Sequence, residues 1–266
     1  MTKITIITVV KNNLVGIRKT IKSIRAQSFL NYEHIIIDSN SDDGTSEFLK
    51  DNLNKKTVYL REEDSGIYHA INKGIIISTG QYIGLLHSGD FFYSKNTLMN
   101  ISENLSNFDY IFGDLVYYKK KNINRIWKFK ENNFYKPNPF IIPHTTLFIK
   151  KHIIVNLDFY EKNLKISSDT DFLIKLCRKN FKYKKLNKFL VFMQSGGVSF
   201  SILNLSKKFM EDIKVLKKYY KIFFILVYFY KVLIKLNGYI FLNFNKELKY
   251  LNKKFQKTII ELETLN

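Results

Sequence analysis

Four aspartates stand where a predicted strand ends or a predicted helix begins, which are common places for a carboxylate to meet a ligand. Asp38 ends the run EHIIID, and Asp90 ends the run YIGLLHSGD. Asp43 and Asp169 stand at predicted helix starts, within SNSDDGT and SSDTD. A carboxylate in such a position can bind a divalent cation, accept a proton from a reacting hydroxyl group or cap a helix.

The local sequence separates these possibilities only in part. Asp43 is best explained as a helix cap, whereas capping and catalysis explain Asp169 and its neighbour Asp171 equally well. Asp38 and Asp90 follow buried strands, and the carboxyl ends of parallel strands meet at one edge of an open α/β sheet, where ligands bind. We therefore interpret Asp90 as the ligand of a divalent metal ion.

The elements that must position these carboxylates alternate between strand and helix over the first ninety residues. Strands are predicted over 3–10, 33–38, 57–61 and 82–86, and helices over 16–27, 46–52 and 67–78. This alternation predicts an α/β fold with a doubly wound, mainly parallel sheet. The later patterns predict a helix over 98–105, a strand over 110–113, a ribbon over 114–130, a strand-like segment over 144–149, a helix over 169–178, two strands over 181–194 and a turn over 195–198.

The composition changes near residue 205, which divides the chain into a predicted domain 1–204 and a basic, aromatic-rich helical tail 205–266. Residues 201–266 carry 13 lysines and 5 acidic residues, and 219–244 are intensely apolar. The longest uninterrupted apolar run, 222–230, is too short to span a bilayer. The pattern predicts helices that lie in the plane of an anionic membrane surface, with snorkelling lysines. A segment for oligomerisation or packing is the structural alternative.

Bulk composition narrows the class of protein. The net charge of +20 and the pI near 9.7 favour anionic partners such as phosphorylated substrates or anionic lipid. Nucleic acid is not expected, because the aromatic residues cluster in the tail rather than among basic residues of the sheet domain. Cys177 is the single cysteine and is expected to be buried, and no signal peptide is evident. These features fit a cytoplasmic protein, peripheral on the inner face of the cell membrane.

A series of ordered fragments carries a resemblance to a known family. These are TIITVVKNN, HIIIDSNSDDGT, EEDSGIYHAINKGI and STGQYIGLLHSGD, followed by PHTTLFIKK, SSDTDFLIKL and GGVS, which together cover about residues 5–199. Their order and spacing resemble an inverting family-2 glycosyltransferase with the GT-A nucleotide-diphospho-sugar transferase fold. The fragments GIYHAINKGI and LLHSGD are similar to those of enzymes that build capsule, colanic-acid and O-antigen polysaccharides.

The resemblance implies a nucleotide-sugar site built by the first ninety residues. Thr8 would line the pocket of the base, and Asp38 would accept a hydrogen bond from a ring N–H of the base. Asn72 and Lys73 would face the donor, where Lys73 could neutralise a phosphate, and Ser88 would contact the same ligand. The structural alternatives are a turn carboxylate for Asp38 and a solvated lysine for Lys73.

The resemblance also implies a reacting centre with Mn²⁺ or Mg²⁺ as cofactor. Asp90 would be the metal-binding aspartate of the family's D-x-D-type motif, and Asp169 would be the general base. The family commonly has further aspartates before the metal ligand, whereas here His87 and Gly89 occupy those positions. His87 is placed to assist as a metal ligand, although a lone histidine is more often structural. His144, after a proline in a rigid loop, is a candidate on the acceptor side.

The leading hypothesis is an inverting glycosyltransferase that moves a sugar from a nucleotide-diphospho-sugar, with a UDP-sugar favoured, to a hydroxyl group of a lipid-linked oligosaccharide in surface-polysaccharide biosynthesis. The alternatives are direct transfer to polyprenyl phosphate, a module that binds a nucleotide or nucleic acid without catalysis, and a degenerate transferase that only scaffolds a complex.

Overall fold

The computed structural model describes residues 3–129, 137–196, 202–240 and 246–264. Its strands are β1 (Ile4–Val10), β2 (Tyr32–Asp38), β3 (Thr57–Arg61), β4 (Tyr82–Leu85), β5 (Phe91–Phe92), β6 (Tyr110–Lys119), β7 (Asn122–Trp127), β8 (Phe148–Lys150) and β9 (Tyr183–Gln194). The helices of the sheet domain are α1 (Leu14–Arg25), α2 (Thr45–Asp51), α3 (Ile67–Ile77), α4 (Thr97–Leu105), η1 (His144–Thr146), α5 (Lys151–Asn156) and α6 (Ser168–Cys177). Strand and helix alternate over the first ninety residues as predicted.

The strands form one mixed sheet in the order β3-β2-β1-β4-β8-β6-β9-β5, with β7 paired to β6. Strands β3, β2, β1 and β4 are parallel, but β8 is antiparallel to both β4 and β6. Among the described strands, four of the eight pairings are antiparallel, so the prediction of a mainly parallel sheet is wrong for the second half of the chain. Two neighbouring parallel strands must be joined by a crossover connection, which is usually a helix. The alternation of strand and helix that predicts such crossovers ends at β4.

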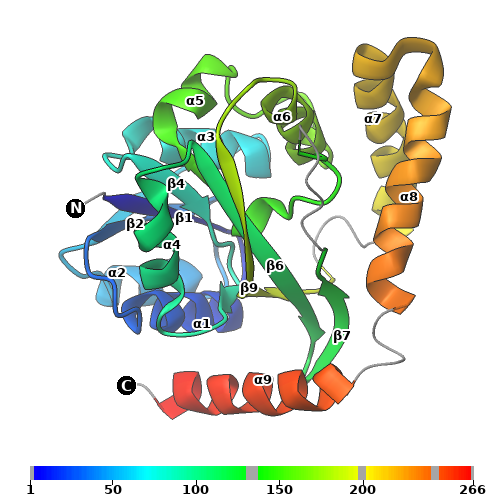
Figure 1. Ribbon diagram of the computed structural model, residues 1–266. Helices are drawn as coiled ribbons and strands as arrows, with labels where there is room; N and C mark the ends of the chain where they lie inside the picture. The colour runs from blue at the N-terminus through cyan, green and yellow to red at the C-terminus, as the bar shows by residue number, and fades with distance from the viewer. Residues whose placement is uncertain (1–2, 130–136, 197–201, 241–245, 265–266) are drawn as a thin grey trace.

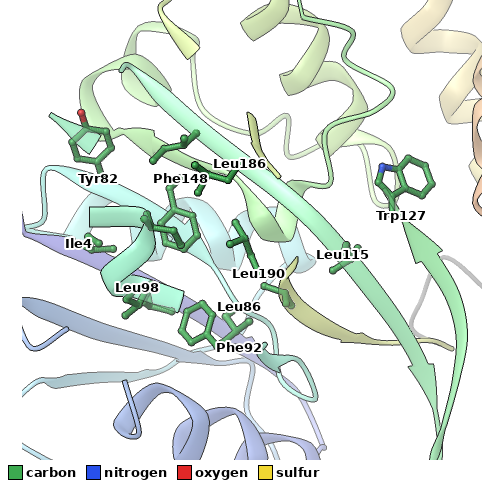
Figure 2. Close-up of a cluster of buried hydrophobic side chains, with 14 of the residues drawn as sticks. Ile4, Tyr82, Leu86, Phe92, Leu98, Leu115, Trp127, Phe148, Leu186 and Leu190 are labelled. Atoms are coloured by element: carbon green, nitrogen blue, oxygen red, sulfur yellow. The ribbon is translucent and has the colours of Figure 1, made fainter. Parts of the chain in front are cut away.

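The central strands are covered by helices on both faces, which explains their continuous apolar sequences (Figure 1). Every residue of β1, β2 and β4 is buried. Figure 2 shows one of the clusters that fill the layers, in which Tyr82, Leu86 and Phe148 lie with side chains of α4 and β9. A Cβ atom on Gly84 would lie 2.4 Å from the Phe148 ring, so β8 can pair with β4 only because that position is glycine.

Two element predictions fail in the second half of the domain. Within 181–194, where two strands are predicted, the structure has the single long strand β9, Tyr183–Gln194. Lys185 is buried within this strand, and its Nζ lies 2.8 Å from Asp114 Oδ1 on β6. The strand-like segment 144–149 divides into the 3₁₀ turn η1 and the start of β8. Some predicted segments extend beyond the described residues. The predicted turn over 195–198 and the fragment GGVS are described only as far as Gly196, and the predicted ribbon over 114–130 is described only as far as residue 129.

The tail forms α7 (Ile202–Tyr220), η3 (Lys221–Phe223), α8 (Phe224–Ile240) and α9 (Lys246–Thr264). In Figure 1, α7 and α8 form a hairpin beside α6 and β7, and α9 lies across the far ends of β7 and α1. The hairpin adds Val215, Leu216 and Ile234 to the core of the sheet domain. Within the described residues, none of the helices combines the length and the hydrophobicity needed to cross a membrane. The division at residue 204 stays a prediction.

Helix α9 buries its own cluster against the sheet. Phe255 is fully buried against Phe91, Tyr118 and Phe192. We expect Phe255→Ala to lower the free energy of unfolding by about 3–5 kcal/mol, because the substitution leaves a cavity in a packed aromatic cluster. Urea denaturation measures the change. The control is Tyr250→Ala on the exposed face of α9, and equal losses for the two variants would contradict this packing.

Candidate active site

A pocket of about 560 Å³ opens at the carboxyl ends of β1 and β4. It is also lined by the start of α3, the segment that leads into α6, and the end of β9. A pocket of this size at a strand-end edge is typical of a site for a small ligand. Of the predicted site residues, those that line it are His87, Ser88, Asp90, His144 and Asp169. Carboxylates 79 residues apart in the sequence therefore share one cavity.

Asp90 is held in place by contacts from α1 and β9. Its Oδ1 accepts a hydrogen bond from the amide of Gln194 at 2.9 Å, and its carbonyl oxygen accepts one from Thr20 Oγ1 at 2.8 Å. The preceding turn needs Gly89, which has φ of +99° and whose Cβ position would lie 2.1 Å from Gln194 Oε1. Burial raises the pKa of Asp90 to about 8, although the Gln194 amide lowers it. Within the described chain, the buried Oδ2 atom has no hydrogen-bond partner.

Two histidines lie between Asp90 and Asp169. The rings of His87 and His144 are 5.8 Å apart between centroids, with planes inclined at 42°. Burial lowers the pKa of His87 to about 3, and burial also lowers the pKa of His144, while Asp169 raises it. The His87 imidazole is therefore neutral at pH 7. His144 Nδ1 lies 3.5 Å from Asp169 Oδ2, and the buried His87 Nδ1 has no partner among the described residues.

Asp169 is the second residue of α6, and its side chain is 27% exposed. Its Oδ1 accepts a hydrogen bond from the Thr170 amide at 2.7 Å and lies 3.4 Å from Tyr68 OH. Burial alone would raise its pKa, but His144 and the tail lysines Lys231, Lys235 and Lys208 lower it below its usual value. The carboxylate is thus ionised at neutral pH, exposed to the pocket and able to accept a proton.

The tail helix α7 fixes the segment that carries Asp169. Glu211 accepts hydrogen bonds from the three successive amides of residues 165–167, at 2.8–3.0 Å. Asp212, next on α7, accepts one from Ser167 Oγ at 2.7 Å. These carboxylates satisfy amide and hydroxyl donors at the start of α6, where negative charge is also favoured by the helix dipole. The position of Asp169 therefore depends on the docked tail.

Thr8 and Asp38 lie within the core and are not among the residues that line the pocket. Thr8 Oγ1 donates to the Leu86 carbonyl oxygen at 2.7 Å. Asp38 accepts hydrogen bonds from Ser41, Ser46 and Tyr59. Burial raises the pKa of Asp38, but these donors lower it further than burial raises it. Their contacts give both side chains a structural role, and contact with a base stays a prediction.

Asn72 and Lys73 are also engaged within the protein. Asn72 exchanges two hydrogen bonds with the backbone of Tyr160, at 2.8 and 3.1 Å, and so fixes the segment before α6. Lys73 Nζ lies 2.9 Å from Asp64 Oδ1 and 3.2 Å from Glu62 Oε2. Neither is among the lining residues, so Lys73 is not placed to neutralise a donor phosphate in this structure, and a donor role for either residue stays a prediction.

Several lining residues had no assigned role in the sequence analysis. Tyr68 donates to the Ile166 carbonyl oxygen at 2.8 Å and stacks on Tyr160 with ring centroids 5.8 Å apart. Asp64 and Lys165 also line the pocket. Tyr68 stands four residues before Asn72 on α3, so helical spacing could have placed both on one face. No local signal marks the tail lysines Lys208, Lys231 and Lys235, because their proximity to Asp169 arises from tertiary packing.

The residues around Asp90 fit a divalent cation whose coordination is completed by a bound substrate. Within the described residues, no group of three or more His, Cys, Asp or Glu side chains is arranged to hold a metal ion. Mg²⁺ is nevertheless often held by one or two carboxylates together with substrate phosphates, and Mn²⁺ likewise prefers oxygen ligands. The unpartnered Oδ2 of Asp90 supplies one such oxygen. The nitrogen of His87 suits these ions less well, and its role as a ligand stays a prediction.

Curated relatives resemble the chain at low identity. An uncharacterized glycosyltransferase of Mycobacterium tuberculosis is 26% identical over 189 residues, which are 65% of this chain and 68% of the relative. A PGL/p-HBAD biosynthesis glycosyltransferase of Mycobacterium bovis is 24% identical, over 58% of this chain and 61% of the relative. An uncharacterized glycosyltransferase of Methanocaldococcus jannaschii is 24% identical, over 83% of this chain and 82% of the relative.

Solved structures share the fold at still lower identity. S. aureus TarS 1–349 in complex with UDP-GlcNAc matches with a TM-score of 0.66 and 14% identity, over 80% of this chain but 65% of the TarS chain. The mannosyltransferase PcManGT from Pyrobaculum calidifontis, in complex with GDP-Man and Mn²⁺, matches with a TM-score of 0.60 and 15% identity, over 99% of this chain and 75% of that one. The fold is thus GT-A-like.

A family model confirms the resemblance seen in the sequence fragments. The model of glycosyl transferase family 2 matches residues 5–163, which is more than half of the chain and includes β1 to β4, Asp90 and His144. The chain belongs to glycosyl transferase family 2 and is a glycosyltransferase.

Proposed function

We propose that the chain is an inverting glycosyltransferase that uses a nucleotide-diphospho-sugar, with a UDP-sugar favoured, and a hydroxyl group of a lipid-linked oligosaccharide in surface-polysaccharide biosynthesis. The observation that carries this proposal is the shared pocket, which is lined by Asp90, the unpartnered carboxylate, and by Asp169, the ionised one. The fold supports it as well, since the S. aureus TarS structure contains UDP-GlcNAc and the PcManGT structure contains GDP-Man.

In this mechanism Asp169 is the general base. It accepts the proton of the acceptor hydroxyl as the oxygen attacks the anomeric carbon, and the bond to the nucleoside diphosphate breaks on the opposite face of the sugar. A single displacement inverts the configuration. The Thr170 amide holds Oδ1, which leaves Oδ2, on the side of His144, for the incoming hydroxyl.

The leaving group carries a diphosphate whose negative charge grows as the sugar departs. A divalent cation held by Asp90 would neutralise that charge when bound. Asp90 is suited to hold one because Gln194 and Thr20 fix its position and its Oδ2 has no competing partner within the described residues. Ser88 and Asn13 also line the pocket, and Asn13 Nδ2 donates to the Ser88 carbonyl oxygen at 3.2 Å.

The outer face of the tail hairpin fits the surface of an anionic membrane. Its exposed apolar residues recur every three or four positions, on one side of η3 and α8, and are Ile222, Leu226, Phe229, Leu233 and Leu236. They are 48–82% exposed, and we call them the apolar stripe. An exposed lysine at 221, in η3, accompanies it. We infer that the protein is peripheral on the inner face of the cell membrane, where a lipid-linked acceptor is available.

The assignment of Asp169 predicts a loss of chemistry without a loss of donor binding. We expect Asp169→Asn to lower kcat by about 10²–10⁴-fold, because an amide cannot accept the proton, and to leave the dissociation constant for UDP nearly unchanged. The control is Asp171→Asn, whose carboxylate pairs with Lys175 and Lys218 away from the pocket and whose loss should lower stability rather than kcat. Equal kcat values for Asp169→Asn and the wild type would reject the base.

The metal assignment predicts that Asp90 couples donor affinity to the cation. In the wild type, Mn²⁺ should tighten UDP binding at least tenfold in isothermal titration, because a bound cation attracts the diphosphate. We expect Asp90→Asn to remove most of this gain, whereas Asp51→Asn, an exposed carboxylate on α2, should retain it. The metal proposal fails if Mn²⁺ tightens UDP binding equally in the two variants.

The apolar stripe predicts membrane binding that depends on α8. We expect the double variant Leu226→Glu with Phe229→Glu to partition at least tenfold less onto vesicles that contain 30% phosphatidylglycerol, because it adds charge to the inserted face. The matched control changes two exposed apolar residues of the sheet domain, Ile76→Glu with Val155→Glu. Flotation assays measure the partitioning, and equal partitioning of both double variants would exclude this face as the docking surface.

A further inference from the structure

Three lysines of the tail gather on the inner side of the α7–α8 hairpin. The buried ion pair between Lys231 Nζ and Asp212 Oδ1, 2.7 Å apart, fixes the register of the two antiparallel helices. Lys235 stands one turn after Lys231 on α8, and Lys208 stands one turn before Asp212 on α7. Because the helices run in opposite directions, these two steps bring Lys208 and Lys235 toward each other. We call Lys208, Lys231 and Lys235 the tail lysine cluster.

The cluster adjoins the proposed base. Lys231 Nζ donates to Thr170 Oγ1 at 3.0 Å, and Thr170 follows Asp169 directly on α6. All three lysines are close enough to Asp169 for their charges to lower the pKa of its carboxyl group. Asp169 therefore lines the donor pocket and also lies within electrostatic reach of the tail lysine cluster.

The positive charge of the cluster is only partly balanced within the described residues. Asp212 is bonded to Lys231 and Ser167, and Glu211 is occupied by the amides of residues 165–167. No hydrogen bond or ion pair joins the ammonium group of Lys208 or Lys235 to another group in the described part of the chain. Burial and the neighbouring lysines lower the pKa of Lys235 to about 7, although Asp212 and Asp169 raise it. An anion beside Lys235 would remove this cost.

We propose that the tail lysine cluster binds a phosphate or diphosphate group of the acceptor, and so places the acceptor hydroxyl at Asp169. The inference rests on the proposed function, since it assigns the acceptor side of the same site. Lysine ammonium groups are well suited to phosphate, which they bind as point charges. The donor's own diphosphate belongs at Asp90, so the anion at the cluster is a second one.

The placement of the cluster favours an acceptor anchored in lipid. The apolar stripe and the tail lysine cluster occupy opposite faces of the same hairpin: Ile234 and Lys231 are buried inward, whereas Leu233 and Leu236 are exposed. If the stripe rests on the membrane, a phosphate that links a lipid to its sugar can reach the cluster while the sugar extends to Asp169. A neutral glycolipid would leave the lysines without a counter-charge.

Binding of farnesyl diphosphate tests the proposal, with farnesol as the uncharged matched probe. Titrations are made with UDP and Mn²⁺ in excess, so that the donor pocket is filled. We expect the double variant Lys208→Gln with Lys235→Gln to bind farnesyl diphosphate at least tenfold more weakly than the wild type. The matched control, Lys207→Gln with Lys214→Gln, removes two exposed lysines of α7 and should bind it within about twofold of the wild type. Lys231 is left intact because its buried ion pair supports the fold.

The outcomes separate the possible sources of the anion. Equal losses in the two double variants, or equal affinity of the wild type for farnesol and farnesyl diphosphate, would overturn the proposal. A greater loss of binding to phosphatidylglycerol vesicles in the cluster variant than in the control would assign the lysines to lipid headgroups and also overturn it.

The single variant Lys208→Gln, with an expected loss of at least threefold, provides the test should the double variant unfold. A wild type that binds farnesyl diphosphate but neither binds UDP nor turns over nucleotide sugars would reject the proposed function alone.

Discussion

The position of the proposed base depends on two carboxylates of the tail. Glu211 takes up three successive backbone amides of the segment before α6, and Asp212 joins the same segment to Lys231 on α8. Charge-assisted hydrogen bonds to donors at a helix start are among the stronger polar contacts in a folded protein. The tail is thus a structural part of the site as well as a candidate membrane surface.

Electrostatics gives the two pocket carboxylates different roles. Asp90 is buried away from cations, so its pKa is raised and its free oxygen favours a positively charged ligand. Asp169 faces His144 and three lysines, so its pKa is lowered and its charge is stable without a metal. Environments that push the pKa values of two nearby carboxyl groups apart are typical of sites in which one group binds and the other exchanges protons.

The sequence predicted that Asp90 lies at the strand-end edge of the sheet, because it follows a buried strand and a glycine-containing turn, and Asp90 lines the pocket there. It located Asp169 only through the resemblance of SSDTDFLIKL to the family, since an aspartate at a helix start is equally well explained as a cap. The parallel half of the sheet followed from strand–helix alternation. Strand structure over 181–194 was predicted as a pair, whereas β9 runs on as one strand, with Lys185 paired to Asp114 in the core.

The remaining features could not be read from the sequence because they arise from contacts between distant segments. The hydroxyl groups of Ser41, Ser46 and Tyr59, which come from separate segments, meet at Asp38, and this network is not evident from the sequence. Lys231 and Lys235 lie within the apolar stretch 219–244, and only the docking of α8 beside α6 brings them near Asp169. Helical spacing shows which residues share a face but not what that face will meet.

The most direct test of the account is an anomalous difference map from crystals grown with UDP and Mn²⁺. The account predicts a manganese peak within coordination distance of Asp90 Oδ2, bridged to the diphosphate, in the same pocket that Asp169 lines. A manganese or UDP site in a different cavity, with Asp90 and Asp169 both remote from it, would contradict the account.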